Sequence, residues 1–142
     1  MTEYIPLLIQ RLKQDDDVIA TYLFGSYAEG KQTPVSDVDL AVLFDQNFPR
    51  KFFFEKKLDL LFTATSILKT DAVDLVILNE APPALSYQVL KKGKLLFEKP
   101  ETKAQRVNFQ VRVYDRYFDF KPVETVVREG LIKRIKEGRF GG

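Results

Sequence analysis

The sequence predicts an α+β fold of the α/β-like kind, in which a small mixed β-sheet with flanking helices is followed by a helical C-terminal extension. Three observations lead to this prediction. Short apolar runs rich in strand-forming residues alternate with segments of helical periodicity. Glycine and proline punctuate the boundaries between these segments. The 142 residues are 45% hydrophobic and 30% charged, which is enough for one unit with a real core.

The first third of the chain is expected to hold one helix and two strands. Apolar residues at helical spacing predict the helix, and an apolar run that ends at Gly25 is typical of a buried strand. The polar segment that contains Gly30 and Pro34 indicates a turn, a short helix and a loop before the next strand. In order, the helix, strand, polar segment and second strand are expected at residues 3–13, 18–24, 26–36 and 37–44.

The middle of the chain predicts a longer helix within residues 49–70 and a third strand over residues 72–78. Four apolar side chains are expected to mark the buried face of the helix, namely Leu58, Leu61, Phe62 and Leu68. The consecutive phenylalanines Phe52, Phe53 and Phe54 cannot all face one side of a helix, so we expect at least one to be exposed or to lie at an interface.

The last part of the chain is predicted to be mainly helical. Pro82 and Pro83 begin a helix that runs to about Leu90, and a short strand follows at residues 95–97. After Pro100, helical spacing recurs in a first helix at Val107, Val111, Tyr114 and Phe118. Pro122 ends that helix, and a last one extends to about Glu137. We therefore divide the chain into a domain at residues 1–98 and a helical extension at residues 99–142 that packs on it and docks a partner.

The composition excludes several classes of protein. No cysteine is present, which excludes a disulfide scaffold, a thiol nucleophile and a cysteine metal site. No histidine is present, which removes the most common general base and every serine–histidine pair. A metal bound here would need oxygen ligands, as magnesium, manganese or calcium do.

Charge is unevenly distributed along the chain. The net charge is +2, but residues 1–98 carry 11 Lys and Arg against 14 Asp and Glu, whereas residues 99–142 carry 11 against 6. The basic tail is either a solvated helix face or a docking surface for an acidic partner. No apolar stretch reaches transmembrane length and the N-terminus lacks signal-peptide features, so a cytoplasmic protein without a membrane partner is expected.

The candidate chemistry lies in the segment GSYAEGKQTPVSDVDLAVLF. Asp37 and Asp39 open the second strand, and because strand side chains alternate, both carboxylates face the same way about 6.5–7 Å apart. Two such carboxylates suit a divalent cation. Asp74 interrupts the apolar third strand, and it completes a triad of acids if that strand pairs beside the second. By contrast, Asp15–Asp17 lie in a polar connection, which favours a solvated turn.

Gly25 and Ser26 are candidates for binding phosphate. A glycine at a strand-to-helix turn lets the backbone approach a ligand closely. Free amides at the start of the following helix favour phosphate, and the serine hydroxyl adds a donor. The sequence therefore predicts a phosphate cradle that faces a carboxylate-bound metal.

These residues resemble the pattern of the nucleotidyltransferase superfamily, which is Gly-Ser, a loop, Asp-x-Asp and a later third carboxylate. The ten-residue spacing is similar to that of the minimal nucleotidyltransferases of prokaryotes. The segment RVNFQVRVYDRYFDFKP also resembles antitoxin members of that group, which are encoded beside a HEPN-domain ribonuclease toxin. The resemblance implies a polymerase-beta palm-like fold, magnesium (with manganese possible) and ATP as the substrate.

The same resemblance implies a reaction and a role for each matching residue. AMP is transferred from ATP to a tyrosine of the HEPN toxin, which silences the toxin. Gly25, Ser26 and Ser36 would bind the nucleotide, and Asp37 and Asp39 would hold metal. Asp74 would hold the catalytic metal or accept the proton of the attacking hydroxyl. Because HEPN ribonucleases use a histidine, this chain is not the toxin itself.

Two alternatives remain open at this stage. The acceptor could be a small molecule such as an aminoglycoside, although the helical tail is short for a drug-binding domain. The protein could also be an antitoxin that acts by binding alone. A nucleic acid as the direct substrate finds no supporting motif. The aromatic residues of the tail are either packed core or partly a docking surface, and these are Tyr114, Tyr117, Phe118 and Phe120.

Overall fold

Helices and strands alternate along the chain as the sequence predicts. The computed structural model describes residues 2–119, so the last predicted helix and Phe120 lie outside the described residues. The α-helices are α1 (Ile5–Lys13), α2 (Phe53–Leu68), α3 (Pro83–Lys92) and α4 (Lys103–Asp119). The strands are β1 (Val18–Phe24), β2 (Val38–Phe44), β3 (Val73–Ile77) and β4 (Lys94–Glu98). Short 3-10 turns cover Thr2–Tyr4, Gly25–Tyr27, Arg50–Phe52 and Pro100–Thr102.

The four strands form one mixed sheet in the order β3-β2-β1-β4. β1 pairs antiparallel with both β2 and β4. β2 and β3 pair in parallel, which requires a crossover, and α2 provides it. The predicted mixed sheet is thus confirmed, and the parallel pair brings the first residues of β2 and β3 to the same end of the sheet.

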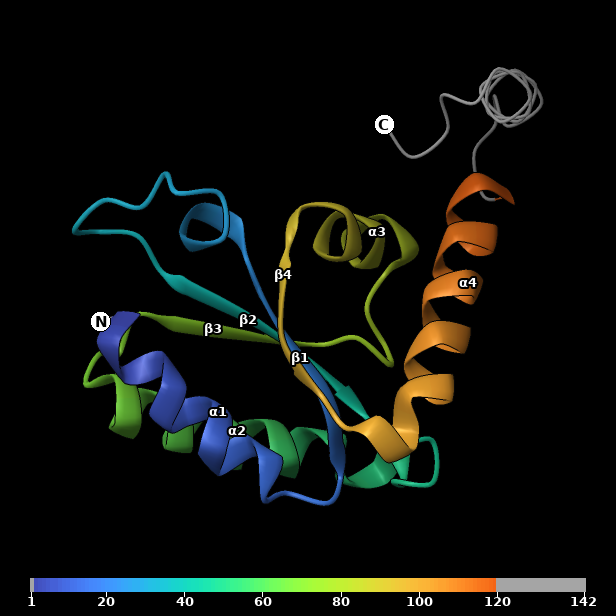
Figure 1. The fold of residues 1–142 in the computed structure, drawn as a ribbon, viewed down its shortest axis with the longest axis horizontal. Coiled ribbons are helices and arrows are strands. Elements are labelled where there is room, and N and C mark those ends of the chain that lie inside the picture. Colours follow the sequence, from blue (N-terminus) through green and yellow to red (C-terminus); the bar gives the residue numbers. More distant parts are fainter. Residues whose placement is uncertain (1, 120–142) are drawn as a thin grey trace.

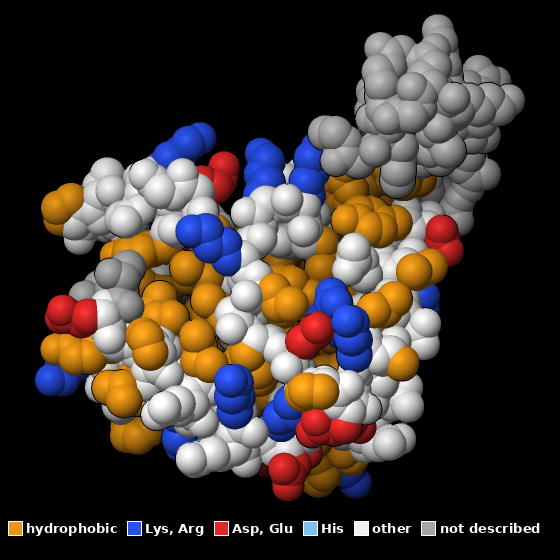
Figure 2. All heavy atoms as spheres, in the orientation of Figure 1, with side chains coloured by type: hydrophobic (Ala, Val, Ile, Leu, Met, Phe, Trp, Pro, Cys, Tyr) orange, Lys and Arg blue, Asp and Glu red, His pale blue; other side chains and the backbone are white. Residues whose placement is uncertain are grey.

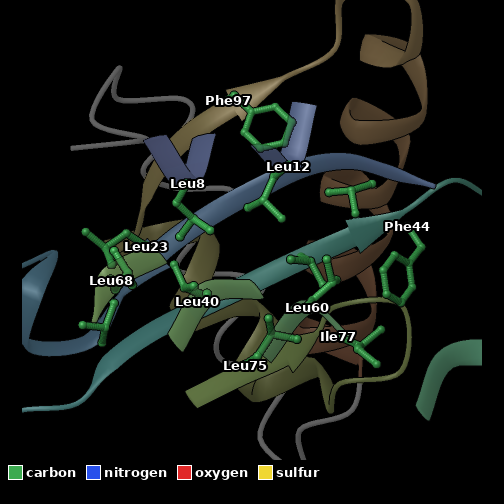
Figure 3. Close-up of a cluster of buried hydrophobic side chains, with 14 of the residues drawn as sticks. Leu8, Leu12, Leu23, Leu40, Phe44, Leu60, Leu68, Leu75, Ile77 and Phe97 are labelled. Atoms are coloured by element: carbon green, nitrogen blue, oxygen red, sulfur yellow. The ribbon is translucent and has the colours of Figure 1, made fainter. Parts of the chain in front are cut away.

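Helices cover both faces of the sheet. α1 and α2 lie side by side against one face, and α3 and α4 lie against the other (Figure 1). The larger core forms under α1 and α2, where Figure 3 shows leucines of both helices meeting those of the strands. The smaller core includes Ala41 and Leu43 of β2, Val89 of α3, and Phe109 of α4.

The buried faces of two helices differ from the predicted ones. In α2, Leu68 is buried as expected and Leu61 is partly buried, but Leu58 and Phe62 are 54% and 73% exposed. The residues that α2 buries are Phe53, Leu60, Ala64 and Leu68. Both sets fit a helical period, so the spacing alone left the rotation of the helix open. The prediction for Phe52–Phe54 is confirmed, since Phe53 is buried while the other two are exposed.

α4 shows a similar rotation. Val107 and Val111 are exposed, and Phe109 and Val113 fill the core in their place. Near the end of the helix, the Tyr117 ring stacks on Tyr87 of α3 at 4.0 Å between centroids. Tyr114 and Phe118 also contact the Tyr87 ring, so these tail aromatics pack between helices. The division of the chain after residue 98 stays a prediction.

Candidate active site

One end of the sheet brings together Gly25, Asp39 and Asp74. Phe24, the last residue of β1, lies opposite Asp39 in the antiparallel register, and Gly25 follows it. Asp39 lies opposite Asp74 in the parallel register of β2 and β3. Leu40 and Leu75 point into the core under α1 and α2, so the two aspartates before them face the side of the sheet that carries α3. The predicted pairing of the third strand beside the second is therefore confirmed.

Burial and neighbouring charge both act on Asp39. Its side chain is partly buried, and burial is the largest cause that raises the pKa of this carboxyl above its usual value. The negative charges of Asp74 and Asp37 raise the pKa of Asp39 further. The three carboxylates are thus close enough to repel one another, which makes this end of the sheet favourable for a cation.

The backbone at Gly25 lies against the Asp39 carboxylate. Its φ of +71° lies in the left-handed region that side chains disfavour. A Cβ at this position would lie 2.1 Å from Asp39 Oδ2, so a side chain here would force the Asp39 carboxylate to move. Glycine is therefore required here both by the turn and by the close approach of the backbone to the carboxylate.

The two predicted serines lie in different surroundings. Ser26 sits in the 3-10 turn directly after β1, half-buried, and its hydroxyl has no hydrogen-bond partner within residues 2–119. Ser36 closes the following loop, because its Oγ accepts a hydrogen bond from the Thr33 amide at 2.8 Å. The expected short helix is a single 3-10 turn, so any phosphate contact there depends on the amides and the Ser26 hydroxyl.

Asp37 and Asp74 are exposed at the rim of this site. Asp74 interrupts an otherwise apolar strand without being buried, because β3 is an edge strand and leaves that side chain in solvent. Asp74 Oδ1 accepts a hydrogen bond from the Leu75 amide at 3.0 Å. Within the described part of the chain, no lysine or arginine pairs with Asp37, Asp39 or Asp74.

The donor chemistry fits a hard divalent cation, since three neighbouring carboxylates lack a basic partner among the described residues. As they are placed, however, no three acidic side chains of residues 2–119 converge into a finished set of metal ligands.

Basic residues that were not predicted as part of the site lie near this end of the sheet. The β1–β4 register places Lys94 opposite Leu23, two residues before Gly25. A Cβ on Gly93 would lie 3.1 Å from the Leu23 carbonyl oxygen, so α3 ends directly against β1. Figure 2 shows basic side chains over this end of α3 and β4, where Lys92 and Lys94 are exposed. A glycine between lysines just before a strand was the available signal.

The second acidic group of the chain, Asp15–Asp17, has a different environment. Lys56 of α2 lies 3.0 Å from both Asp15 Oδ2 and Asp17 Oδ2. The Asp15 backbone carbonyl also accepts a hydrogen bond from the Lys99 ammonium. The predicted solvated turn is therefore only partly correct, because Asp16 is exposed while Asp15 is held in an ion pair.

Comparison with known proteins adds a family and relatives. Residues 7–102 match the family model described as polymerase beta, nucleotidyltransferase. A protein of Aphanizomenon flos-aquae named protein adenylyltransferase MntA is 30% identical over 115 residues, which cover 77% of this chain and 75% of that protein. A protein of the same name from Shewanella oneidensis is 41% identical over 76 residues, which cover 54% of this chain and 51% of the relative.

A solved structure is similar to the whole described fold. It is a crystal structure of a toxin–antitoxin with AMP-PNP, at 27% sequence identity and a TM-score of 0.65. The match covers 92% of this chain and 97% of that one.

Proposed function

The chain belongs to the polymerase beta nucleotidyltransferase family, and on that premise we propose that it is a protein adenylyltransferase that acts as an antitoxin. Its substrate is ATP, and its acceptor is a tyrosine hydroxyl of a HEPN-domain ribonuclease toxin with which it forms a complex. Transfer of AMP to that tyrosine neutralises the toxin. The observation that carries the proposal is the register that sets Asp39 beside Asp74 and in contact with Gly25.

The reaction moves one nucleotidyl group. The acceptor oxygen forms a bond to the α-phosphorus of ATP while the bond from that phosphorus to the pyrophosphate oxygen breaks. The proton of the acceptor hydroxyl goes to a carboxylate of the site, and we assign this role to Asp74, which is exposed at the rim. Asp74 alternatively acts as a ligand of the catalytic metal.

The remaining residues bind and orient the nucleotide. The amides of the turn and the free hydroxyl of Ser26 donate to the phosphates. Asp37 and Asp39 would hold Mg²⁺, or Mn²⁺ in its place, which supplies positive charge to the phosphates. Ser36 acts through the shape of the loop, because its hydroxyl is already bonded to Thr33.

Intact-mass spectrometry of the HEPN protein encoded beside this chain tests the proposal. The partner is incubated with this protein, ATP and magnesium, and it should gain one or more AMP masses. The variant Asp37→Asn/Asp39→Asn is the control and should leave the partner mass unchanged. A stable complex without any mass gain would instead support an antitoxin that acts by binding alone. If neither a mass gain nor a complex is observed, small-molecule acceptors should be tested next.

Location in the cell is a separate question. Within residues 2–119, none of the helices has the length and apolar character needed to cross a membrane. The cytoplasmic location expected from the sequence stays a prediction, which fractionation of cells that express the tagged protein would check.

A further inference from the structure

A cavity of about 590 Å³ lies between α4, the start of α3 and the last residues of β2. Its lining includes Leu43 and Phe44 but none of the aspartates or the turn of the candidate active site. Asp39 and Phe44 are five residues apart on one strand, which corresponds to about 16 Å. The cavity is therefore a separate feature at the opposite end of the sheet.

The floor of the cavity is apolar and preformed. Its side chains come from β1, β2, the residue that follows β3, and α4, and all belong to the smaller core. They are Ile19, Leu43, Leu78, Phe109 and Val113. Because these residues are at most 8% exposed, packing fixes their positions, and they offer a rigid surface for a flat apolar group.

One wall of the cavity is a row of polar side chains on α4. The row contains Asn108, Arg112 and Arg116, which are spaced four residues apart and therefore share one face of the helix, with about 6 Å along the axis between successive residues. In the described part of the chain neither Arg112 nor Arg116 forms an ion pair or hydrogen bond. Arg106 on the same helix does, with Glu98 and with Gln110 at 3.2 Å.

The opposite wall supplies a buried hydroxyl. Ser86 of α3 is 2% exposed and lines the cavity, and its hydroxyl makes no hydrogen bond to any described residue. Two other polar lining residues already have partners, because Asn79 bonds the backbone of Phe44 and Gln105 bonds Asp45. The groups left for a ligand are therefore two guanidinium groups, the side-chain amides of Asn108 and Gln46, and one hydroxyl.

The nearby carboxylates of Asp45 and Glu80 form no ion pair with Arg112 or Arg116. Asp45 Oδ2 accepts the Gln105 hydrogen bond at 3.1 Å, and its Oδ1 accepts one from the Asn47 amide. Glu80 lies 4.0 Å from Arg50, which is a different arginine. Arg112 and Arg116 thus remain available to an anion that enters the cavity.

We propose that this cavity binds a phosphate ester of nucleotide size, with the base on the apolar floor and the phosphate between Arg112 and Arg116. Guanidinium groups bind phosphate oxygens in pairs of parallel hydrogen bonds, and a preformed cavity of several hundred Å³ holds a ligand of this size. This second site is distinct from the one that binds the reacting ATP, and it does not depend on the identity of the acceptor.

Calorimetric titration of the full chain tests the proposal. AMP-PNP with magnesium should reveal two sites per chain, and one of them should persist in EDTA. The EDTA-resistant affinity should fall about tenfold or more in Arg112→Gln/Arg116→Gln. It should be unchanged in Lys51→Gln/Lys103→Gln, which removes the same charge elsewhere, and in Asp37→Asn/Asp39→Asn. Thermal melts confirm that each variant is folded.

Three probes identify the source of the ligand. Binding of AMP supports a free nucleotide, and tighter binding of the dinucleotide ApA supports the same phosphate ester at the end of a nucleic acid. Inorganic phosphate that binds as well as AMP would overturn the proposal, because the floor would then contribute nothing. A single site that Asp37→Asn/Asp39→Asn abolishes would overturn it as well.

Discussion

The chain contains two groups of three aspartates, and they differ in whether a lysine of the fold pairs with them. Asp15–Asp17 receive a lysine from within the fold, since Lys56 reaches two of the three carboxylates at 3.0 Å. Asp37, Asp39 and Asp74 receive none from residues 2–119, and Asp39 is partly buried beside the other two. The first group gains a cationic partner within the fold, whereas the second leaves an electrostatic cost that an external cation can remove.

The largest expected effect separates the two groups by function. Asp37→Asn/Asp39→Asn should lower AMP transfer at least about 10²–10³-fold, the scale for loss of one preorganised electrostatic contact. The matched variant Asp15→Asn/Asp17→Asn should retain transfer but melt at a lower temperature, because Lys56 loses its partners. Rates from intact-mass spectrometry and thermal melts measure both. Equal activity in the two variants would contradict the comparison.

The second prediction concerns Gly25, which contacts Asp39 in the group of aspartates without a lysine partner. Gly25→Ala should destabilise the protein by more than Gly30→Ala and should abolish transfer. Both glycines have φ near +70°, so both substitutions introduce left-handed strain of about 1–2 kcal/mol. Only at Gly25 would the new Cβ also collide with Asp39, since nothing lies within 4 Å at Gly30. Urea unfolding and transfer rates check this, and equal losses of stability would mean that the contact with Asp39 has no effect.

The third prediction removes the internal cation. The Lys56 and Asp15 side chains are 18% and 12% exposed, so their ion pair is shielded from solvent. Lys56→Met should lower the free energy of unfolding by about 1–3 kcal/mol, the range for a charged hydrogen bond lost in a partly buried place. AMP transfer should not change. Lys57→Met on the same helix serves as the control, and a similar loss of stability there would point to a general effect on α2.

The smallest predicted effect is a stability that depends on pH. Because the folded-state pKa of Asp39 is raised, by burial first and then by Asp74 and Asp37, the folded protein binds the proton more tightly than the unfolded chain does. The ionised Asp39 carboxylate therefore lowers the free energy of unfolding. This loss of stability is absent below the usual pKa of an aspartate and develops as the pH rises through the raised folded-state pKa. Asp39→Asn should melt slightly above the wild type at neutral pH in EDTA, and the gap should close at acidic pH.

Addition of magnesium reverses the sign of that comparison. The wild type should gain melting temperature, because a ligand that binds only the folded state stabilises it. Asp39→Asn should gain less or nothing. Equal gains in both proteins would show that the cation binds elsewhere.

Much of the fold could be predicted because the strands are unambiguous. β1 is a nearly continuous apolar run, and so is β2 after Asp39, which is the pattern typical of strands buried on both faces. The rotation of the helices could not be predicted in the same way. α2 carries apolar residues on several sides, so Leu58 and Phe62 fit a helical period as well as Leu60 and Ala64 do. Only packing against the sheet decides between the two faces.

The candidate site was predictable for a related reason. Asp39 and Asp74 are each the second residue of their strand. Parallel pairing of the two strands therefore places them opposite each other, whatever conformation the loops adopt. The role of Lys56 could not be predicted, because it joins α2 to a turn 39 residues earlier in the sequence. The Arg112 and Arg116 cavity was also missed, since the periodicity of α4 indicated a different buried face.

The parallel pairing of β2 and β3 also affects the timing of folding. Asp39 and Asp74 are 35 residues apart and meet only after the crossover helix has closed between them. Contacts of this separation form late, because the loop-closure entropy must be overcome before they stabilise the chain. During synthesis, a ribosome-bound chain that has not yet released β3 lacks one of its three acids. Binding of the proposed cation should therefore follow the pairing of β2 and β3, so that luminescence of a bound lanthanide would report the formation of this strand pair in real time.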